Sequence, residues 1–174
     1  TYIVMNNQIY GLTAGQISPT SLKGHVTKTT PKGSLEEPIN PLALAMAGGA
    51  TFVARGFSGD PGHLTSLIAQ AISHKGFALI DVLQPCVTFN KINTFDFFRK
   101  RVYKLEEAAH ASADFNVALE KTKEWGEKIP IGLFYKTERP ALDQEKTTPG
   151  FPSPSDWAGP LAEENVQKIL SEFL

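Results

Sequence analysis

Three short apolar runs, each followed by a polar or glycine-rich turn, limit the fold of this chain more than any other feature. They are "TYIVM" (residues 1–5), "TFVARG" (51–56) and "FALIDVLQP" (77–85). All three are rich in the β-branched and aromatic residues typical of strands. Near-continuous apolar runs occur in strands that are covered on both faces. We therefore expect three buried strands at these positions.

The segments between these runs carry helix signals. Asn40 precedes Pro41, and Asp60 precedes Pro61, so each pair offers a capping side chain and a proline that fits the first helical turn. After Asp60, apolar residues recur on one helical face at Leu64, Leu67, Ile68, Ala71 and Ile72. The alternation of strands and helices predicts an α/β fold with a parallel sheet and helices on both faces. Right-handed crossovers would place the carboxyl ends of the strands along one edge.

The pattern changes after residue 86. Residues 93–107 and 114–128 are expected to form surface helices, and "IPIGLFYK" (129–136) another strand. Residues 137–160 are proline-rich and irregular, and a C-terminal helix is expected from Val166, Ile169, Leu170, Phe173 and Leu174. The prediction is one domain over residues 1–136, followed by an arm and helix over 137–174 that dock on the domain or on a partner.

Composition excludes several classes of protein. The 174 residues are 41% hydrophobic with a net charge of −1, which fits a globular chain and gives no basic surplus for nucleic acid. No apolar run reaches the roughly 20 residues needed to cross a bilayer, so no membrane anchor is expected. Cys86 is the single cysteine, so an internal disulfide is excluded and a reducing compartment, the cytoplasm, is expected.

The loop after the first strand, "NNQIYGLTAGQ" (6–16), carries the residues most suited to binding. Asparagine amide oxygens and loop carbonyls are ligands that Mg²⁺ accepts. Gly11 would let the backbone approach a diphosphate closely, and Thr13 could donate hydrogen bonds to it. Ligands in open α/β sheets bind beyond the carboxyl ends of strands. From the residues alone, a turn without a ligand stays open for this loop, and a small buried hydrophobe stays open for Cys86.

Three motifs in order carry a family resemblance: "NNQIYGLTAGQISPTS", "KTTPKGSLEEPINPLALAMAGGATFVARGF" and "LQPCVTFN". The chain resembles the thiamine-diphosphate-binding beta subunit of 2-oxoacid:ferredoxin oxidoreductases from residue 1 to about residue 140, and the 2-oxoglutarate type most of all. The resemblance implies the C-terminal portion of the thiamine-diphosphate-binding fold. It also implies oxidative decarboxylation of a 2-oxoacid with coenzyme A to acyl-CoA and CO₂, with electrons passing through a [4Fe–4S] cluster to ferredoxin.

The resemblance also assigns metal ligands. Asn7 matches the second asparagine of the family's magnesium motif, and Ile9 would supply a carbonyl ligand. Cys86, in "QPCVTF", matches the sequence-distant ligand of the [4Fe–4S] cluster. His25 and Lys28 lie in the long loop 17–39, which by resemblance packs near the cofactor and a partner subunit.

The family wraps the diphosphate and faces the thiazolium with the residues that follow this asparagine, and these correspond here to Tyr10, Gly11, Leu12 and Thr13. Leu12 and Thr13 would therefore be catalytic. Leu12 and Ala14 would flank the side chain of the substrate. Some relatives carry lysine where this chain has Ala14, so a second substrate carboxylate would have to find another cation.

The family's Gly-Asp-Gly motif and its other cluster cysteines do not occur in this sequence. We therefore expect a preceding part of the beta subunit, an alpha subunit, and in some forms gamma and delta subunits, and we expect this chain alone to be inactive. The remaining partners implied are ferredoxin, coenzyme A and the 2-oxoacid. A pyruvate or branched-chain form of the enzyme is one alternative. A non-catalytic α/β binding module is the alternative from another class.

Overall fold

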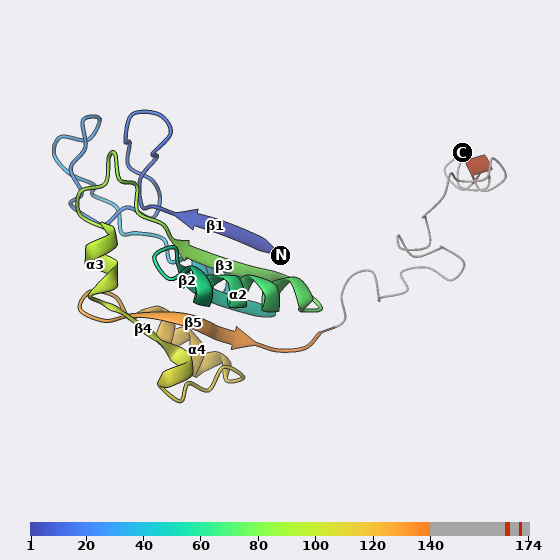
Figure 1. Ribbon diagram of the computed structural model, residues 1–174. Helices are drawn as coiled ribbons and strands as arrows, with labels where there is room; N and C mark the ends of the chain where they lie inside the picture. Colours follow the sequence, from blue (N-terminus) through green and yellow to red (C-terminus); the bar gives the residue numbers. More distant parts are fainter. Residues whose placement is uncertain (140–165, 168–170, 172–174) are drawn as a thin grey trace. The chain divides into compact units, whose positions relative to one another are not determined.

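A five-stranded sheet organises the part of the chain that the computed structural model describes, residues 1–139, 166–167 and 171 (Figure 1). The strand order is β1-β3-β2-β5-β4. In chain order the elements are β1 (Tyr2–Asn6), α1 (Pro41–Ala47), β2 (Phe52–Phe57), α2 (Pro61–Ser73), β3 (Ala78–Leu83), α3 (Phe95–Arg99), β4 (Val102–Lys104), the 3₁₀ helix η1 (Leu105–Glu107), α4 (Phe115–Thr122) and β5 (Ile129–Lys136).

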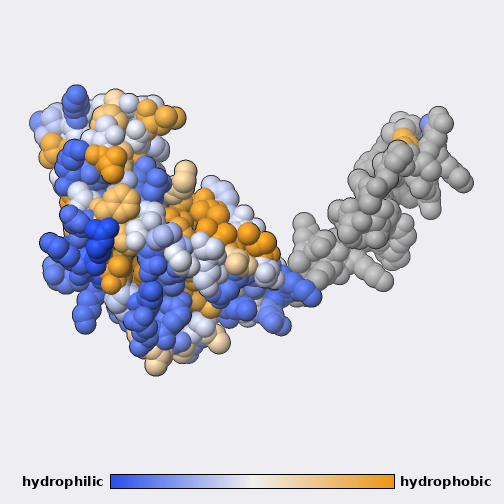
Figure 2. Space-filling view, viewed as in Figure 1, coloured by the Kyte–Doolittle hydropathy of each residue, from blue (hydrophilic) through white to orange (hydrophobic). Residues whose placement is uncertain are grey.

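The strands β1, β2 and β3 are parallel to one another, as predicted. β3 lies between β1 and β2, and every residue of β2 and β3 is buried. The expectation of a buried first strand is wrong for this chain, because β1 lies at the edge and its Tyr2, Ile3 and Met5 side chains are exposed. Figure 2 shows hydrophobic surface over this edge of the sheet. Three exposed apolar side chains on an open strand edge suit a surface that another segment covers.

The far side of the sheet differs from the prediction. The strand expected at 129–136 forms as β5, but it runs antiparallel to β2, with a bulge between Val53 and Ala54. The helix expected over 93–107 is wrong, since α3 ends at Arg99 and β4 then pairs parallel to β5. The β-branched and aromatic residues Val102 and Tyr103 satisfy the open edge of β5, and this tertiary pairing outweighs the helical pattern.

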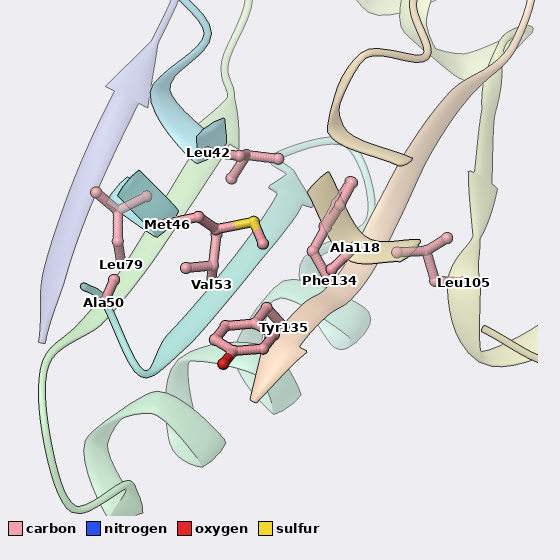
Figure 3. Close-up of a cluster of buried hydrophobic side chains, with 9 residues drawn as sticks. All are labelled: Leu42, Met46, Ala50, Val53, Leu79, Leu105, Ala118, Phe134 and Tyr135. Carbon is pink, nitrogen blue, oxygen red and sulfur yellow. The ribbon is translucent and has the colours of Figure 1, made fainter. Parts of the chain in front are cut away.

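Helices cover both faces of the sheet, as the sequence predicts. One face carries α1, η1 and α4, and Figure 3 shows their side chains in one buried cluster with those of the strands. Its buried members are Leu42, Met46, Ala50, Val53, Leu79, Leu105, Ala118, Phe134 and Tyr135. On the other face, Leu67 and Ala71 of α2 pack against Phe52, Ala54 and Ile80. Alternate residues of β2 thus enter opposite cores, which is the period-two geometry of a strand.

The two predicted caps are present. Asn40 Oδ1 accepts hydrogen bonds from the backbone N–H groups of Leu42 and Ala43, and Asp60 Oδ1 accepts one from that of His63. Each cap is worth about 1 kcal/mol.

The domain division at residue 136 stays a prediction, and most of the predicted arm and C-terminal helix lies outside the described residues. None of the helices in the described ranges has the length and hydropathy needed to cross a bilayer.

Candidate cofactor site

The two asparagines at the end of β1 build two successive side-chain turns. Asn6 Oδ1 accepts a hydrogen bond from the backbone N–H of Gln8 (3.3 Å), and Asn7 Oδ1 accepts one from that of Ile9 (3.2 Å). Asparagine favours such turns because its side chain hydrogen-bonds the backbone two residues on. Gln8 has a positive φ of 56°, which is uncommon outside glycine. The pair of asparagines therefore turns the chain sharply out of the sheet.

The turn leads into a small closed loop over residues 10–16. The backbone N–H of Tyr10 donates to Gln16 O (2.9 Å), and that of Gly15 donates to Tyr10 O (3.1 Å). Gln16 Oε1 accepts hydrogen bonds from the Thr13 hydroxyl and from the backbone N–H of Ala14. These bonds hold the loop in a defined shape, and they leave the side chain of Leu12, which is 98% exposed, at its tip.

This loop lines an open crevice of about 770 Å³ at the carboxyl end of β1. Six of the sequence-predicted site residues line it, namely Asn7, Ile9, Tyr10, Gly11, Leu12 and Thr13, whereas Ala14 does not. Gln16, Ser18 and Thr20 also line it and were not predicted, because nothing in their spacing separates them from ordinary loop residues. His25 is buried inside the long loop and Lys28 is exposed, and neither lines the crevice.

Cys86, from the loop after β3, lies directly against the loop over residues 10–16, which we call the cofactor loop. A Cβ atom added at Gly11 would lie 2.9 Å from Cys86 Sγ and 3.3 Å from Asn7 Nδ2. Real Cβ atoms do not approach a sulfur so closely, so glycine at position 11 is what permits the contact. The predicted magnesium ligand Asn7 and the predicted cluster ligand Cys86, far apart in sequence, thus both lie next to Gly11.

The surroundings of Cys86 lower the pKa of its thiol. Burial by itself raises the pKa of the Cys86 thiol, but hydrogen bonding from the backbone of Phe89, Thr88 and Asn90, together with the charge of Lys91, brings the pKa below its usual value. A thiolate is the form that binds metals. Among the described residues, no group of three or more His, Cys, Asp and Glu side chains stands close enough together to hold a metal ion.

Asn90 joins the two loops, and sequence reasoning missed it. Its Nδ2 donates to Asn7 O (3.0 Å), and its backbone N–H donates to Cys86 O (3.1 Å). Its Oδ1 accepts from the backbone N–H groups of Ile92 and Asn93. The side chain is 1% exposed, so these bonds are made away from water. Asn90 therefore fixes the position of the Asn7 loop relative to the Cys86 loop.

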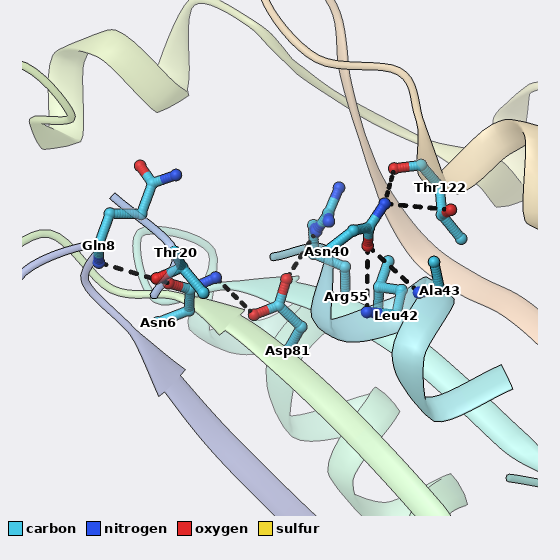
Figure 4. A network of polar contacts seen from close by, with 9 residues as sticks. All are labelled: Asn6, Gln8, Thr20, Asn40, Leu42, Ala43, Arg55, Asp81 and Thr122. Atoms are coloured by element: carbon cyan, nitrogen blue, oxygen red, sulfur yellow. Dashed lines mark hydrogen bonds and ion pairs between the residues drawn. The ribbon is translucent and has the colours of Figure 1, made fainter. Parts of the chain in front are cut away.

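A buried polar network supports the same strand ends (Figure 4). Asn6 Nδ2 donates to Asp81 Oδ1 (2.9 Å), and Arg55 Nε donates to Asp81 Oδ2 (3.0 Å). Thr20 Oγ1 donates to Asn6 Oδ1 (2.8 Å) and ties the long loop to the same point. The sequence held a signal for the ion pair, since Arg55 and Asp81 are single charges within apolar runs. The parallel register places them side by side.

Two family models match the chain. Residues 1–82 match the C-terminal TPP-binding domain of thiamine pyrophosphate enzymes. Residues 86–148 match the C-terminal part of the pyruvate ferredoxin oxidoreductase beta subunit. The boundary between the two models falls beside Cys86, at the end of β3. The first match supports a thiamine diphosphate site in this part of the chain.

Individual relatives agree with these models. A 2-oxoacid:ferredoxin oxidoreductase subunit beta from Saccharolobus solfataricus is 45% identical over 163 residues, which are 88% of this chain and 53% of the relative. The 2-oxoglutarate oxidoreductase subunit KorB of Mycobacterium tuberculosis is 50% identical over 100 residues, which are 58% of this chain and 26% of the relative. The chain thus spans about half the length of the first of these relatives, and less of the second.

A solved structure matches the fold. It is a 2-oxoglutarate:ferredoxin oxidoreductase from Magnetococcus marinus with 2-oxoglutarate, coenzyme A and succinyl-CoA bound, and the TM-score is 0.78 at 40% identity. The match covers 99% of this chain and 52% of that chain. Sequence, family models and fold agree, and the chain belongs to the beta subunits of the 2-oxoacid:ferredoxin oxidoreductases.

Proposed function

We propose that the chain forms the cofactor-binding half of a beta subunit in an enzyme that oxidises a 2-oxoacid with coenzyme A to acyl-CoA and CO₂ and delivers the electrons to ferredoxin. The observation that carries the proposal is the packing of the Cys86 side chain against Gly11, beside the side chain of Asn7. A binding module would have no need of a cysteine with a lowered pKa packed against this loop. An enzyme that couples decarboxylation to electron transfer needs its electron acceptor beside its organic cofactor.

The residues of the crevice fit thiamine diphosphate and Mg²⁺. The amide oxygen of Asn7 and the carbonyl of Ile9 are neutral oxygen donors, which Mg²⁺ accepts together with diphosphate oxygens. Tyr10, Gly11 and Thr13 would line the diphosphate. When bound, thiamine diphosphate supplies the carbanion-stabilising chemistry of decarboxylation, and the protein supplies orientation and electrostatics. Leu12 would cover the thiazolium from the loop tip and limit the access of water.

Cys86 fits a cluster ligand. A [4Fe–4S] cluster is held by four thiolates, and the hydrogen bonds that lower the pKa of Cys86 also suit a sulfur bound to iron. Cys86 would supply one thiolate, and the part of the subunit that the relatives carry beyond the matched half would supply the others. Ferredoxin, an alpha subunit and coenzyme A complete the proposed set of partners, with the cytoplasm as the location.

We propose 2-oxoglutarate as the substrate, because the named activity of the Mycobacterium tuberculosis relative and of the Magnetococcus marinus structure is towards 2-oxoglutarate. Leu12 and Ala14 are the proposed substrate-side residues. If they face the substrate, Ala14→Lys raises kcat/KM for 2-oxoglutarate relative to pyruvate, because a cation in a partly dry site attracts the second carboxylate strongly. An unchanged ratio would remove Ala14 from the substrate side.

The test of the proposed function uses the complete enzyme. Its thiamine diphosphate and iron content should be measured, together with ferredoxin reduction that depends on both a 2-oxoacid and coenzyme A. The proposal requires both cofactors and dependence on both substrates. Absence of both thiamine diphosphate and iron from the complete protein would contradict the proposal and favour the non-catalytic binding module.

A further inference from the structure

A second cavity, of about 210 Å³, shares Asn6 and Thr20 with the cofactor crevice but is otherwise built from different residues. It lies between the long loop 17–39, the start of α1, β2 and the segment that follows α4. Its apolar lining comes from Leu22, Pro38, Ile39, Pro41 and Trp125, and its polar lining from Asn6, Gln8, Thr20, Asn40, Arg55, Thr122 and Lys123. A cavity of about 150 Å³ already holds a benzene-sized molecule, so this one has room for a small organic ligand.

Arg55 brings unused hydrogen-bonding capacity to this cavity. Arg55 is 2% exposed, and it donates a hydrogen bond to Asp81 from Nε. Nη1 is buried and has no hydrogen-bond partner among the described residues. The guanidinium also lies by Trp125, with Cζ 5.4 Å from the ring centroid. An unpaired buried donor costs about 1–3 kcal/mol, and a guanidinium has five N–H groups, so Arg55 retains donors for a further acceptor.

Gln8 is a second polar side chain that lacks a partner at the same cavity. It is 4% exposed, and its Oε1 is buried without a hydrogen-bond partner among the described residues. Rotation of the terminal amide exchanges its oxygen and nitrogen, so Gln8 is able to offer a donor as well as an acceptor. Two other polar side chains of the cavity lining, both drawn in Figure 4, already have partners, since Asn40 caps α1 and bonds Thr122 while Thr20 bonds Asn6.

We propose that this cavity binds a small monocarboxylic acid, with its carboxylate on Arg55 and Gln8 and its apolar body against Ile39 and Trp125. The planar fork of arginine matches the geometry of a carboxylate, and one guanidinium serves two carboxylates through different N–H groups. Asp81 already balances the charge of Arg55, so a single further negative charge is tolerated better than a doubly charged phosphate. Lys123 adds a positive charge among the lining residues. The site uses none of the proposed cofactor ligands, so it stands independently of the proposed function.

The test measures propionate binding to the complete enzyme by titration calorimetry. Propionate has no keto group next to its carboxylate, so it is not a substrate for decarboxylation. Ile39 lines the cavity, so the larger side chain of the variant Ile39→Trp should fill it. Leu35→Trp is the matched control, because Leu35 lies in the same loop, is 85% exposed and does not line the cavity. One propionate should bind per chain in the wild type and in Leu35→Trp, and none in Ile39→Trp.

Two further measurements sharpen the result. Gln8→Leu should weaken propionate binding about tenfold, which corresponds to the loss of one hydrogen bond of about 1.4 kcal/mol. In crystals of the complete enzyme soaked in propionate, the carboxylate should lie within hydrogen-bond distance of Arg55. The proposal is overturned if the wild type binds no propionate or if Ile39→Trp binds it equally well. It is also overturned if an Asp or Glu side chain from elsewhere in the enzyme fills the cavity.

Discussion

At the scale of single residues, Asn7 is the proposed magnesium ligand. Replacement by leucine keeps the size of the side chain and removes its oxygen, so the variant Asn7→Leu should bind thiamine diphosphate much more weakly at fixed Mg²⁺. Loss of a residue that only orients a metal ligand already costs roughly 10–100-fold in metal affinity, so loss of a ligand itself should cost more than about tenfold. A titration of the complete enzyme measures this, with Asn116→Leu as the control because Asn116 is exposed at the start of α4. Equal affinities in the three proteins would rule out Asn7.

Gly11 is the residue at which the cofactor loop and the Cys86 loop touch. In Gly11→Ala the new methyl group would lie 2.9 Å from Cys86 Sγ, so one loop has to shift. We expect a loss of about 1–3 kcal/mol of stability, which is typical of overpacking. Gly62→Ala is the control, because no atom lies within 4 Å of its added Cβ and alanine favours the helix α2. Thermal unfolding of the complete enzyme should show a lower midpoint for Gly11→Ala alone.

At the scale of elements, the loop after β3 is tied to the loop after β1 by Asn90. The variant Asn90→Ala leaves Asn7 O and the N–H groups of Ile92 and Asn93 without this partner, at a cost of about 1–3 kcal/mol. We expect thiamine diphosphate affinity to fall about tenfold and the EPR signal of the reduced cluster to change in the same variant. If the EPR signal changed while cofactor affinity stayed the same, Asn90 would not couple the loops.

The long loop 17–39 should respond to acid through His25. Burial lowers the pKa of His25 below its usual value of about 6.5. The loop is therefore fully stable above that pH and loses stability as the pH falls through the interval down to the folded-state pKa, because the unfolded chain takes up the proton first. Hydrogen exchange of the loop amides should speed up at mildly acidic pH beyond the intrinsic change. His25→Phe should abolish this extra increase, and persistence of the increase would point to another group.

Some helices and strands could be predicted from the sequence, and others could not. The strands 51–56 and 77–85, the caps at Asn40 and Asp60, and the helices on both faces follow from local patterns and from burial. The reversal of β5, the strand β4 inside a helical pattern, and the exposed edge of β1 depend on which strands become neighbours. Asn90 was missed for the same reason, since its role exists only after distant segments meet. Arg55 and Asp81 each stand out as a single charge within an apolar run, but their pairing depends on the strand register.

At the scale of the whole molecule, we propose that the chain supplies only part of the cofactor site. Its cofactor crevice is open, and the side chains of Tyr2, Ile3 and Met5 are exposed along the edge strand β1. We expect the 174 residues on their own to show no reduction of a dye that depends on a 2-oxoacid, because a complete magnesium site and a four-thiolate cluster both need further residues. The complete enzyme assayed beside it is the control. Activity in the isolated chain would contradict a site shared between segments.

The proposed function depends most on Cys86 as a ligand of an iron–sulfur cluster next to the thiamine site. The decisive measurement compares iron content and the EPR spectrum of the reduced complete enzyme with those of its Cys86→Ala variant, with thiamine diphosphate content measured in both. We predict that the variant keeps thiamine diphosphate, has a labile cluster or an altered signal, and loses ferredoxin reduction, whereas Cys86→Ser retains a weakened cluster through its oxygen. Full iron content and an identical EPR signal in Cys86→Ala would contradict the account and leave Cys86 as a small packed side chain.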